Sequence, residues 1–135
     1  MTWIKQPFEA RMENKLKAEY GETRGEDIYA KYTTARRKLV EQILPEIKAI
    51  ENNLTDHGPE HIKNVIKNVD RLLGDDIDKF LPIELYCLGL VILFHDVGNI
   101  FGRKDHNKNI SQIYDYVRND LSEFRDEKTI ILTAA

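Results

Sequence analysis

The four histidines of the chain all lie between positions 57 and 106, close to several carboxylates. His57 and His61 stand in the run Asp-His-Gly-Pro-Glu-His, His95 is followed directly by Asp96, and His106 follows an aspartate. Imidazole and carboxylate groups bind divalent metal ions, and imidazole also titrates near neutral pH. The grouping therefore predicts a metal-binding or acid–base site.

The sequence around these residues is typical of helices joined by short connectors. Apolar residues recur at helical spacing, glycine and proline are few, and no repeat or strand pattern occurs. The expected fold class is all-α, a bundle of about six helices. We expect Gly21 and Gly25 to bracket the end of the first helix and Pro45 to divide the second. The predicted helices cover residues 8–20, 26–52, 59–73 and 82–96, a fifth helix capped by Asp105, and a sixth from Glu127.

The third and fourth predicted helices carry the histidines that matter most. The fourth is apolar almost all round, which indicates a central helix, and it ends in His95 and Asp96. His61 lies one turn before Val65 on the apolar face of the third helix, so it is expected to point inward. We expect the two helix ends to form an imidazole–imidazole–carboxylate set with open coordination positions. The predicted core face of the third helix comprises Ile62, Val65, Ile66, Val69, Leu72 and Leu73.

Two phrases of the sequence, His57-Gly58-Pro59-Glu60-His61-Ile62 and Phe94-His95-Asp96-Val97-Gly98, resemble the HD superfamily of metal-dependent phosphohydrolases. Members carry a His…His-Asp…Asp pattern on an all-helical core, and the resemblance covers residues 55–117. It implies an HD-domain-like helical bundle in which His61, His95 and Asp96 bind a divalent ion. Mn, Fe, Mg, Ni and Zn are equally compatible with this set. His57 and His106 match positions that in some members bind a second metal or touch substrate phosphate.

The resemblance implies hydrolysis of a phosphate ester or nucleotide by a metal-activated water, with Asp96 as the catalytic carboxylate. The expected partner is a phosphorylated small molecule or a nucleotide. Arg103, Lys104 and Lys108 flank His106 and are candidates for neutralising substrate phosphate. On their own, such basic residues more often form a solvated surface.

Two departures from the family pattern stand out. The last Asp ligand has no clear equivalent: Asp115, Asp120 and Asp126 are available, but Asp115 falls on the surface rhythm of its helix. We expect that ligand beyond Ala135, in a longer protein with a C-terminal partner domain. Asn99 stands where many members have lysine.

Other interpretations remain open. An HD-like module could bind a nucleotide or metal without turnover and pass a signal to a partner domain. Alternatively, the domain is a helical interaction module whose histidines have no function. His95 would then interact with the free carbonyl groups at the C-terminal end of its helix. Cys87 is expected to pack in the core with a raised pKa. The run Arg36-Arg37-Lys38 is interpreted as part of the solvent-exposed face of an amphipathic helix.

Composition limits the remaining function classes. The formal net charge is only -3, so no overall field draws the protein onto nucleic acid or an anionic membrane. The single cysteine excludes an internal disulfide and, with no secretion signal, favours a cytoplasmic location. The domain prediction is an N-terminal helical segment, residues 1–53, packed on an HD-type core, residues 54–135. The N-terminal helices could cover that core, form a homodimer contact, or do both.

Overall fold

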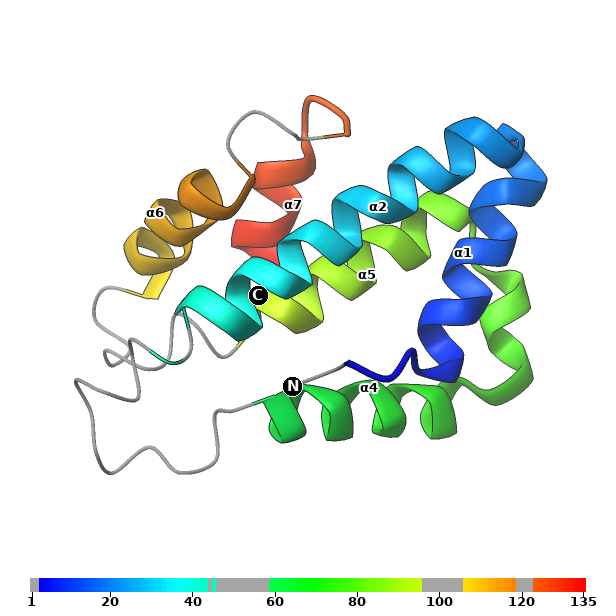
Figure 1. Ribbon diagram of the computed structural model, residues 1–135, viewed down its shortest axis with the longest axis horizontal. Helices are drawn as coiled ribbons and strands as arrows, with labels where there is room; N and C mark the ends of the chain where they lie inside the picture. Colours follow the sequence, from blue (N-terminus) through cyan, green and yellow to red (C-terminus); the bar gives the residue numbers. More distant parts are fainter. Residues whose placement is uncertain (1–2, 44, 46–58, 96–105, 119–122) are drawn as a thin grey trace.

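The computed structural model describes residues 3–43, 45, 59–95, 106–118 and 123–135. These ranges contain six α-helices and no strand, so the predicted all-α fold is confirmed (Figure 1). A π-helical turn, η1 (Leu39–Ile43), continues α2, and a 3₁₀ helix, η2 (Gly74–Lys79), joins α4 to α5. The α-helices are α1 (Pro7–Tyr20), α2 (Glu22–Lys38), α4 (Pro59–Leu73), α5 (Pro82–His95), α6 (His106–Arg118) and α7 (Glu127–Ala134).

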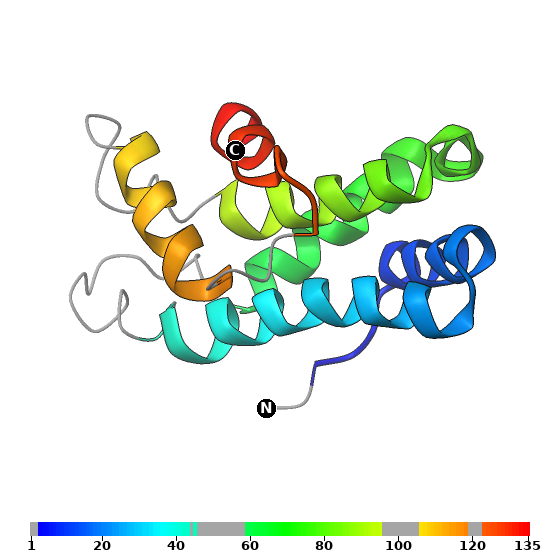
Figure 2. The ribbon, with the colours of Figure 1, turned by 90° about the horizontal axis from the view of Figure 1, so that it is seen from above.

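Helix α5 is the centre of the bundle, as its nearly continuous apolar sequence predicts. It packs against α1, α2, α4 and α7. Figure 2 shows α1 and α2 in one layer on one side of α5 and α7 on the other. Leu85, Tyr86, Leu90 and Phe94 are completely buried. The N-terminal helices thus share one core with α5, although the domain boundary at residues 53 and 54 stays a prediction.

Helices α4 and α5 form an antiparallel hairpin closed by η2. Helix α4 ends at Leu73, as predicted, and η2 begins at Gly74. Figure 1 shows the first turn of α4 and the last turn of α5 at the same end of the molecule, where α2 ends and α6 begins. The hairpin therefore places His61 and His95 at one end of the bundle.

The turn between α1 and α2 differs from the sequence prediction. Only Gly21 breaks the chain, with φ 89°, and α2 begins at Glu22. Gly25 lies inside α2 and is buried, because α1 approaches so closely that a Cβ there would stand 2.5 Å from Cα of Lys17. Gly25 was thus misread as a helix breaker, since a glycine needed for close packing looks the same in sequence.

Leu72 was wrongly placed on the core face of α4. Its exposed fraction is 83%, whereas Ile62 and Ile66 are buried and Val65, Val69 and Leu73 are partly buried. Residues on a helix are rotated by about 100° from one to the next, which turns Leu72 to the flank of the stripe set by Ile62 and Ile66. In the ranges described, no helix is both long and apolar enough to cross a bilayer.

Replacing Gly25 with alanine tests the close approach of α1 and α2. Helix propensity alone would stabilise the protein by about 1 kcal/mol. We expect instead a loss of about 2 kcal/mol in the free energy of unfolding, because the added methyl group meets the backbone of Lys17. Urea denaturation measures the change. Thr23→Ala, at an exposed position of the same helix, is the control; a Gly25→Ala protein more stable than the wild type would refute the packing argument.

Candidate functional site

Two of the predicted metal ligands are described, and both lie at helix ends. His61 is half-buried in the first turn of α4, and His95 is the exposed last residue of α5. Because α4 and α5 are antiparallel neighbours, these two ends face the same side of the molecule (Figure 1). Each imidazole is therefore held on a packed helix, at the same end of the bundle.

The remaining predicted site residues are only partly covered by the structure. His57, Asp96, Arg103 and Lys104 lie outside the described residues. His106 is the first residue of α6, which starts at the same end of the bundle, and Lys108 in that first turn is exposed. Within the described ranges, no group of three His, Cys, Asp or Glu side chains is gathered closely enough to hold a metal ion.

The alternative carboxylates for the last ligand can be placed in two cases. Asp115 is exposed on α6 and pairs with Lys128, at 2.9 Å between Oδ1 and Nζ. Its predicted surface position is confirmed. Asp126 is exposed at the N-cap position of α7, although its side chain makes no capping hydrogen bond. Asp120 lies outside the described residues.

A buried carboxylate that the sequence analysis did not single out holds α5, α6 and α7 together. Glu127 accepts hydrogen bonds from Tyr114 Oη at 2.8 Å, Tyr86 Oη at 3.0 Å and Arg118 Nε at 2.9 Å. The backbone N–H of Glu123 donates a fourth at 2.7 Å. Glu127 and Arg118 are 0% and 1% exposed, so the ion pair is removed from water. We call these residues the Glu127 cluster.

The Glu127 cluster also reaches α2. Arg118 donates one hydrogen bond to the carbonyl of Lys31 at 2.8 Å and another to Tyr86 Oη at 2.7 Å. Burial, together with the charge of Glu127, raises the pKa of Tyr86, so its phenol stays protonated and donates to the carboxylate. The cluster therefore joins α2, α5, α6 and α7 and fixes the helix that carries His95.

Comparison with known proteins assigns the chain to a family. The model of the HD-CE family matches residues 51–134, which is more than half of the chain. The chain belongs to the HD-CE family. HD-CE is a family of HD-type domains, so the resemblance stated from the sequence is confirmed. No curated protein and no solved structure match the chain.

A second buried carboxylate supports the HD-CE domain from its N-terminal side. Glu9 is 0% exposed and accepts hydrogen bonds from Gln6 N at 2.8 Å and Tyr32 Oη at 2.8 Å. Arg36 forms an ion pair with the same carboxylate. The interpretation of residues 36–38 as part of the solvent-exposed face of a helix is thus wrong for Arg36. Arg37 is exposed as expected, and the half-buried Lys38 donates to the carbonyl of Val117 at 3.2 Å.

Neither buried carboxylate could be recognised in the sequence. A glutamate in the first turn of a helix ordinarily interacts with the helix dipole at the surface. Glu9 and Glu127 both occupy such first turns. Some of their partners, Tyr32 and Arg36 for Glu9 and Tyr86 for Glu127, lie 23 to 41 residues away in the sequence. Only tertiary packing reveals which long side chains fold inward.

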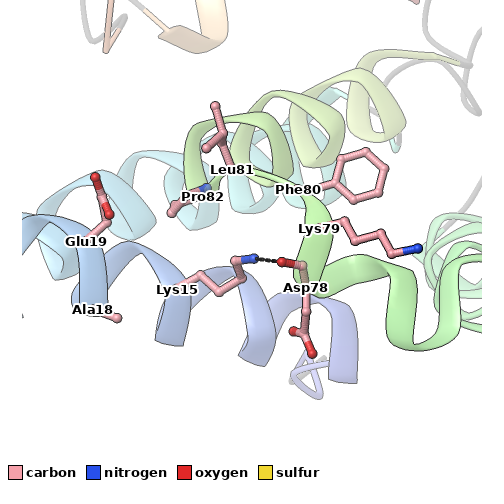
Figure 3. Close-up of a pocket in the computed structure, with 8 residues that line it drawn as sticks. All are labelled: Lys15, Ala18, Glu19, Asp78, Lys79, Phe80, Leu81 and Pro82. Atoms are coloured by element: carbon pink, nitrogen blue, oxygen red, sulfur yellow. Dashed lines mark hydrogen bonds between the residues drawn. The ribbon is translucent and has the colours of Figure 1, made fainter.

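A shallow hollow of about 340 Å³ lies between α1 and the η2–α5 junction (Figure 3). Lys15, Glu19, Phe80 and Leu81 are among the residues that line it. Lys15 Nζ already donates to the carbonyl of Asp78 at 3.0 Å. The hollow lies at the closed end of the α4–α5 hairpin, away from His61 and His95, so we assign it no part in the candidate metal site.

Glu127→Gln tests the buried ion pair in the HD-CE domain. The substitution leaves Arg118 buried without a countercharge, so we expect the free energy of unfolding to fall by about 3 kcal/mol. Lys128→Ala is the matched control. It breaks only the exposed pair with Asp115 and should cost less than about 1 kcal/mol. Equal losses in the two variants, measured by urea denaturation, would contradict the assignment of the cluster as the link between α5, α6 and α7.

The expectation for Cys87 is confirmed and gives a pH-dependent prediction. Burial raises the pKa of the Cys87 thiol from 9.0 to about 11. Because the thiolate is the reactive form, alkylation at pH 8 should be on the order of a hundredfold slower in the folded protein than in the unfolded chain. The folded-state rate should keep rising with pH up to about 11. Mass spectrometry after iodoacetamide treatment measures both rates, and equal rates would contradict the raised pKa.

Proposed function

We propose that this HD-CE domain binds a divalent metal ion through His61, His95 and Asp96 and hydrolyses a phosphate ester or a nucleotide. The observation that carries the proposal is the placement of His61 and His95 at the same end of the α4–α5 hairpin. Membership of an HD-type family supports it independently. Asp96 follows His95 directly in the sequence and supplies the carboxylate of the set.

The donor chemistry of these residues fits such an ion. Two imidazoles and one carboxylate can hold Mn, Fe, Mg, Ni or Zn, and they leave coordination positions open for water and substrate. His61 is half-buried on a helix whose neighbours are core residues, which limits the positions its ring can take. His95 is exposed, so a substrate has access to it. A bound ion would lower the pKa of its water and polarise a phosphoryl oxygen.

We assign the following roles in metal binding and hydrolysis to individual residues. His61 and His95 bind the ion, and Asp96 both binds it and orients the attacking water. Lys108 is exposed in the first turn of α6, where its ammonium group can meet a substrate phosphate. Arg103 and Lys104, just before α6 in the sequence, would add positive charge to the same side.

His57 and His106 complete the proposal. Both stand near the ligand set in the sequence, His57 four residues before His61, and would serve a second ion or the substrate. The last aspartate of the HD pattern has no clear equivalent in the sequence. Asp115 is not its substitute, because it is exposed and engaged with Lys128.

The metal content of purified protein tests the proposal. We expect the wild type to retain close to one equivalent of a transition metal, and His95→Ala and Asp96→Ala each to lose most of it, since each removes one of three protein ligands. Asp115→Asn is the matched control, because it neutralises an exposed carboxylate on α6. Elemental analysis gives the metal-to-protein ratio. Wild-type protein that neither retains nor binds added Mn²⁺, Fe²⁺, Ni²⁺ or Zn²⁺ would refute the proposal.

Turnover is measured separately with the same variants. A generic aryl phosphodiester and a panel of nucleotides, with added Mn²⁺, should be hydrolysed by the wild type and by Asp115→Asn and not by Asp96→Ala. Retained metal with nucleotide binding and no hydrolysis would favour a regulatory binding module in place of the enzyme.

A further inference from the structure

Trp3 is the single tryptophan of the chain, and it is half-buried just before α1. Its indole Nε1 donates a hydrogen bond to Glu9 Oε1 at 2.9 Å. Two cations also lie near this ring: the Arg36 guanidinium is 4.7 Å and Lys63 Nζ 5.6 Å from its centroid. Trp3 therefore connects the N-terminal segment with both α2 and α4.

The contact on α4 falls beside His61. Lys63, two residues further along, is only 8% exposed. Its ammonium group donates to Glu60 Oε1 at 3.0 Å, one residue before the histidine. A cation over an aromatic face is attracted more strongly when it is desolvated, as Lys63 is here. The indole thus meets the helical turn that contains His61.

A second contact holds α4 to the N-terminal helices further along. The backbone N–H of Phe8 donates to Asp70 Oδ2 at 2.8 Å, two helical turns after Lys63. Trp3, before α1, and Phe8, in α1, thus both hold α4, and the Trp3 contact is the one near the histidine. Figure 1 shows the segment before α1, drawn in dark blue, close to α4.

The first turn of α4 needs such contacts to prevent it from fraying. The first N–H groups of a helix have no partner within the helix, so helix ends fray unless other contacts hold them. A metal ligand on a fraying turn would spend part of its time out of position, and binding would have to order it. The contact between Trp3 and Lys63 opposes that fraying, because Lys63 is only two residues after His61.

We propose that Trp3 is a positioning residue for His61: through Lys63 it holds the first turn of α4 in the arrangement that binds metal. The inference rests on the proposed metal-binding function. It does not make Trp3 a catalytic residue, because the indole touches neither His61 nor a reacting atom in the contacts described.

Trp3→Leu and Trp3→Phe separate positioning from simple packing. Leucine keeps apolar bulk without an aromatic face, whereas phenylalanine keeps the face and loses only the hydrogen bond to Glu9. Phe80→Leu is the matched control, a half-buried aromatic residue at the closed end of the same hairpin. If Trp3→Leu does not fold, Lys63→Met removes the cation while keeping an apolar side chain of similar length.

Two measurements are made on each protein. Hydrogen exchange of the metal-free protein follows the amides of residues 63–66, the first in α4 with intrahelical partners. We expect Trp3→Leu to exchange them on the order of tenfold faster. Titration with Mn²⁺ or Zn²⁺ should show binding weakened by about tenfold, the lower end of what the loss of supporting contacts costs a metal site. Trp3→Phe should restore most of both values, and Phe80→Leu should change neither.

The outcomes distinguish this inference from the proposed function. Unchanged exchange of residues 63–66 in Trp3→Leu overturns the inference whatever the metal data show. Faster exchange with unchanged metal affinity overturns the link to His61 and leaves the proposed function standing. A wild type that binds no metal overturns both, and equal losses in Trp3→Leu and Phe80→Leu reduce Trp3 to ordinary packing.

Discussion

The structure depends on the need to cover α5 on every side. This helix has no polar face, so each of its flanks must meet another apolar surface, and α1, α2, α4 and α7 supply them. Once α5 is enclosed, the remaining freedom is small. Helix α4 must lie antiparallel to it because η2 is short, and the two histidine-bearing ends then meet at the open end of the hairpin.

Two buried carboxylates make this arrangement specific. Apolar contacts alone would allow α1 to slide along α2, and α7 along α5, with little loss. Glu9 and Glu127 each require several donors at fixed positions, and any slippage would leave a charge buried without its partners. The polar contacts therefore select one packing among those the apolar core would accept. They lie on opposite sides of α5, one on the N-terminal helices and one on α6 and α7.

The sequence predicts most of the elements and only part of their surroundings. Periodicity located α4 and α5 within a residue or two, because their apolar residues report directly which face is buried. It failed for Leu72 and Gly25, whose environments depend on the angle at which a neighbouring helix crosses. The ion pairs of Arg36 and Arg118 could not be predicted for the same reason. The sequence does not show whether a long charged side chain points toward the core or toward solvent. For the candidate site, motif spacing indicated His61 and His95, whereas the support from Trp3 arises between segments about sixty residues apart in sequence and leaves no local pattern.

The separation between Phe8 and Asp70 has a consequence for how the chain is made. A ribosome releases α1 well before α4 and α5 exist, so the apolar stripe of Phe8, Met12 and Leu16 must wait in solvent for its partners. Pairing α1 with α2 through Gly25 covers part of that stripe early, because this contact is local. The close pairing of α1 with α2 thus also shortens the time for which this stripe is exposed before the central helix is synthesised.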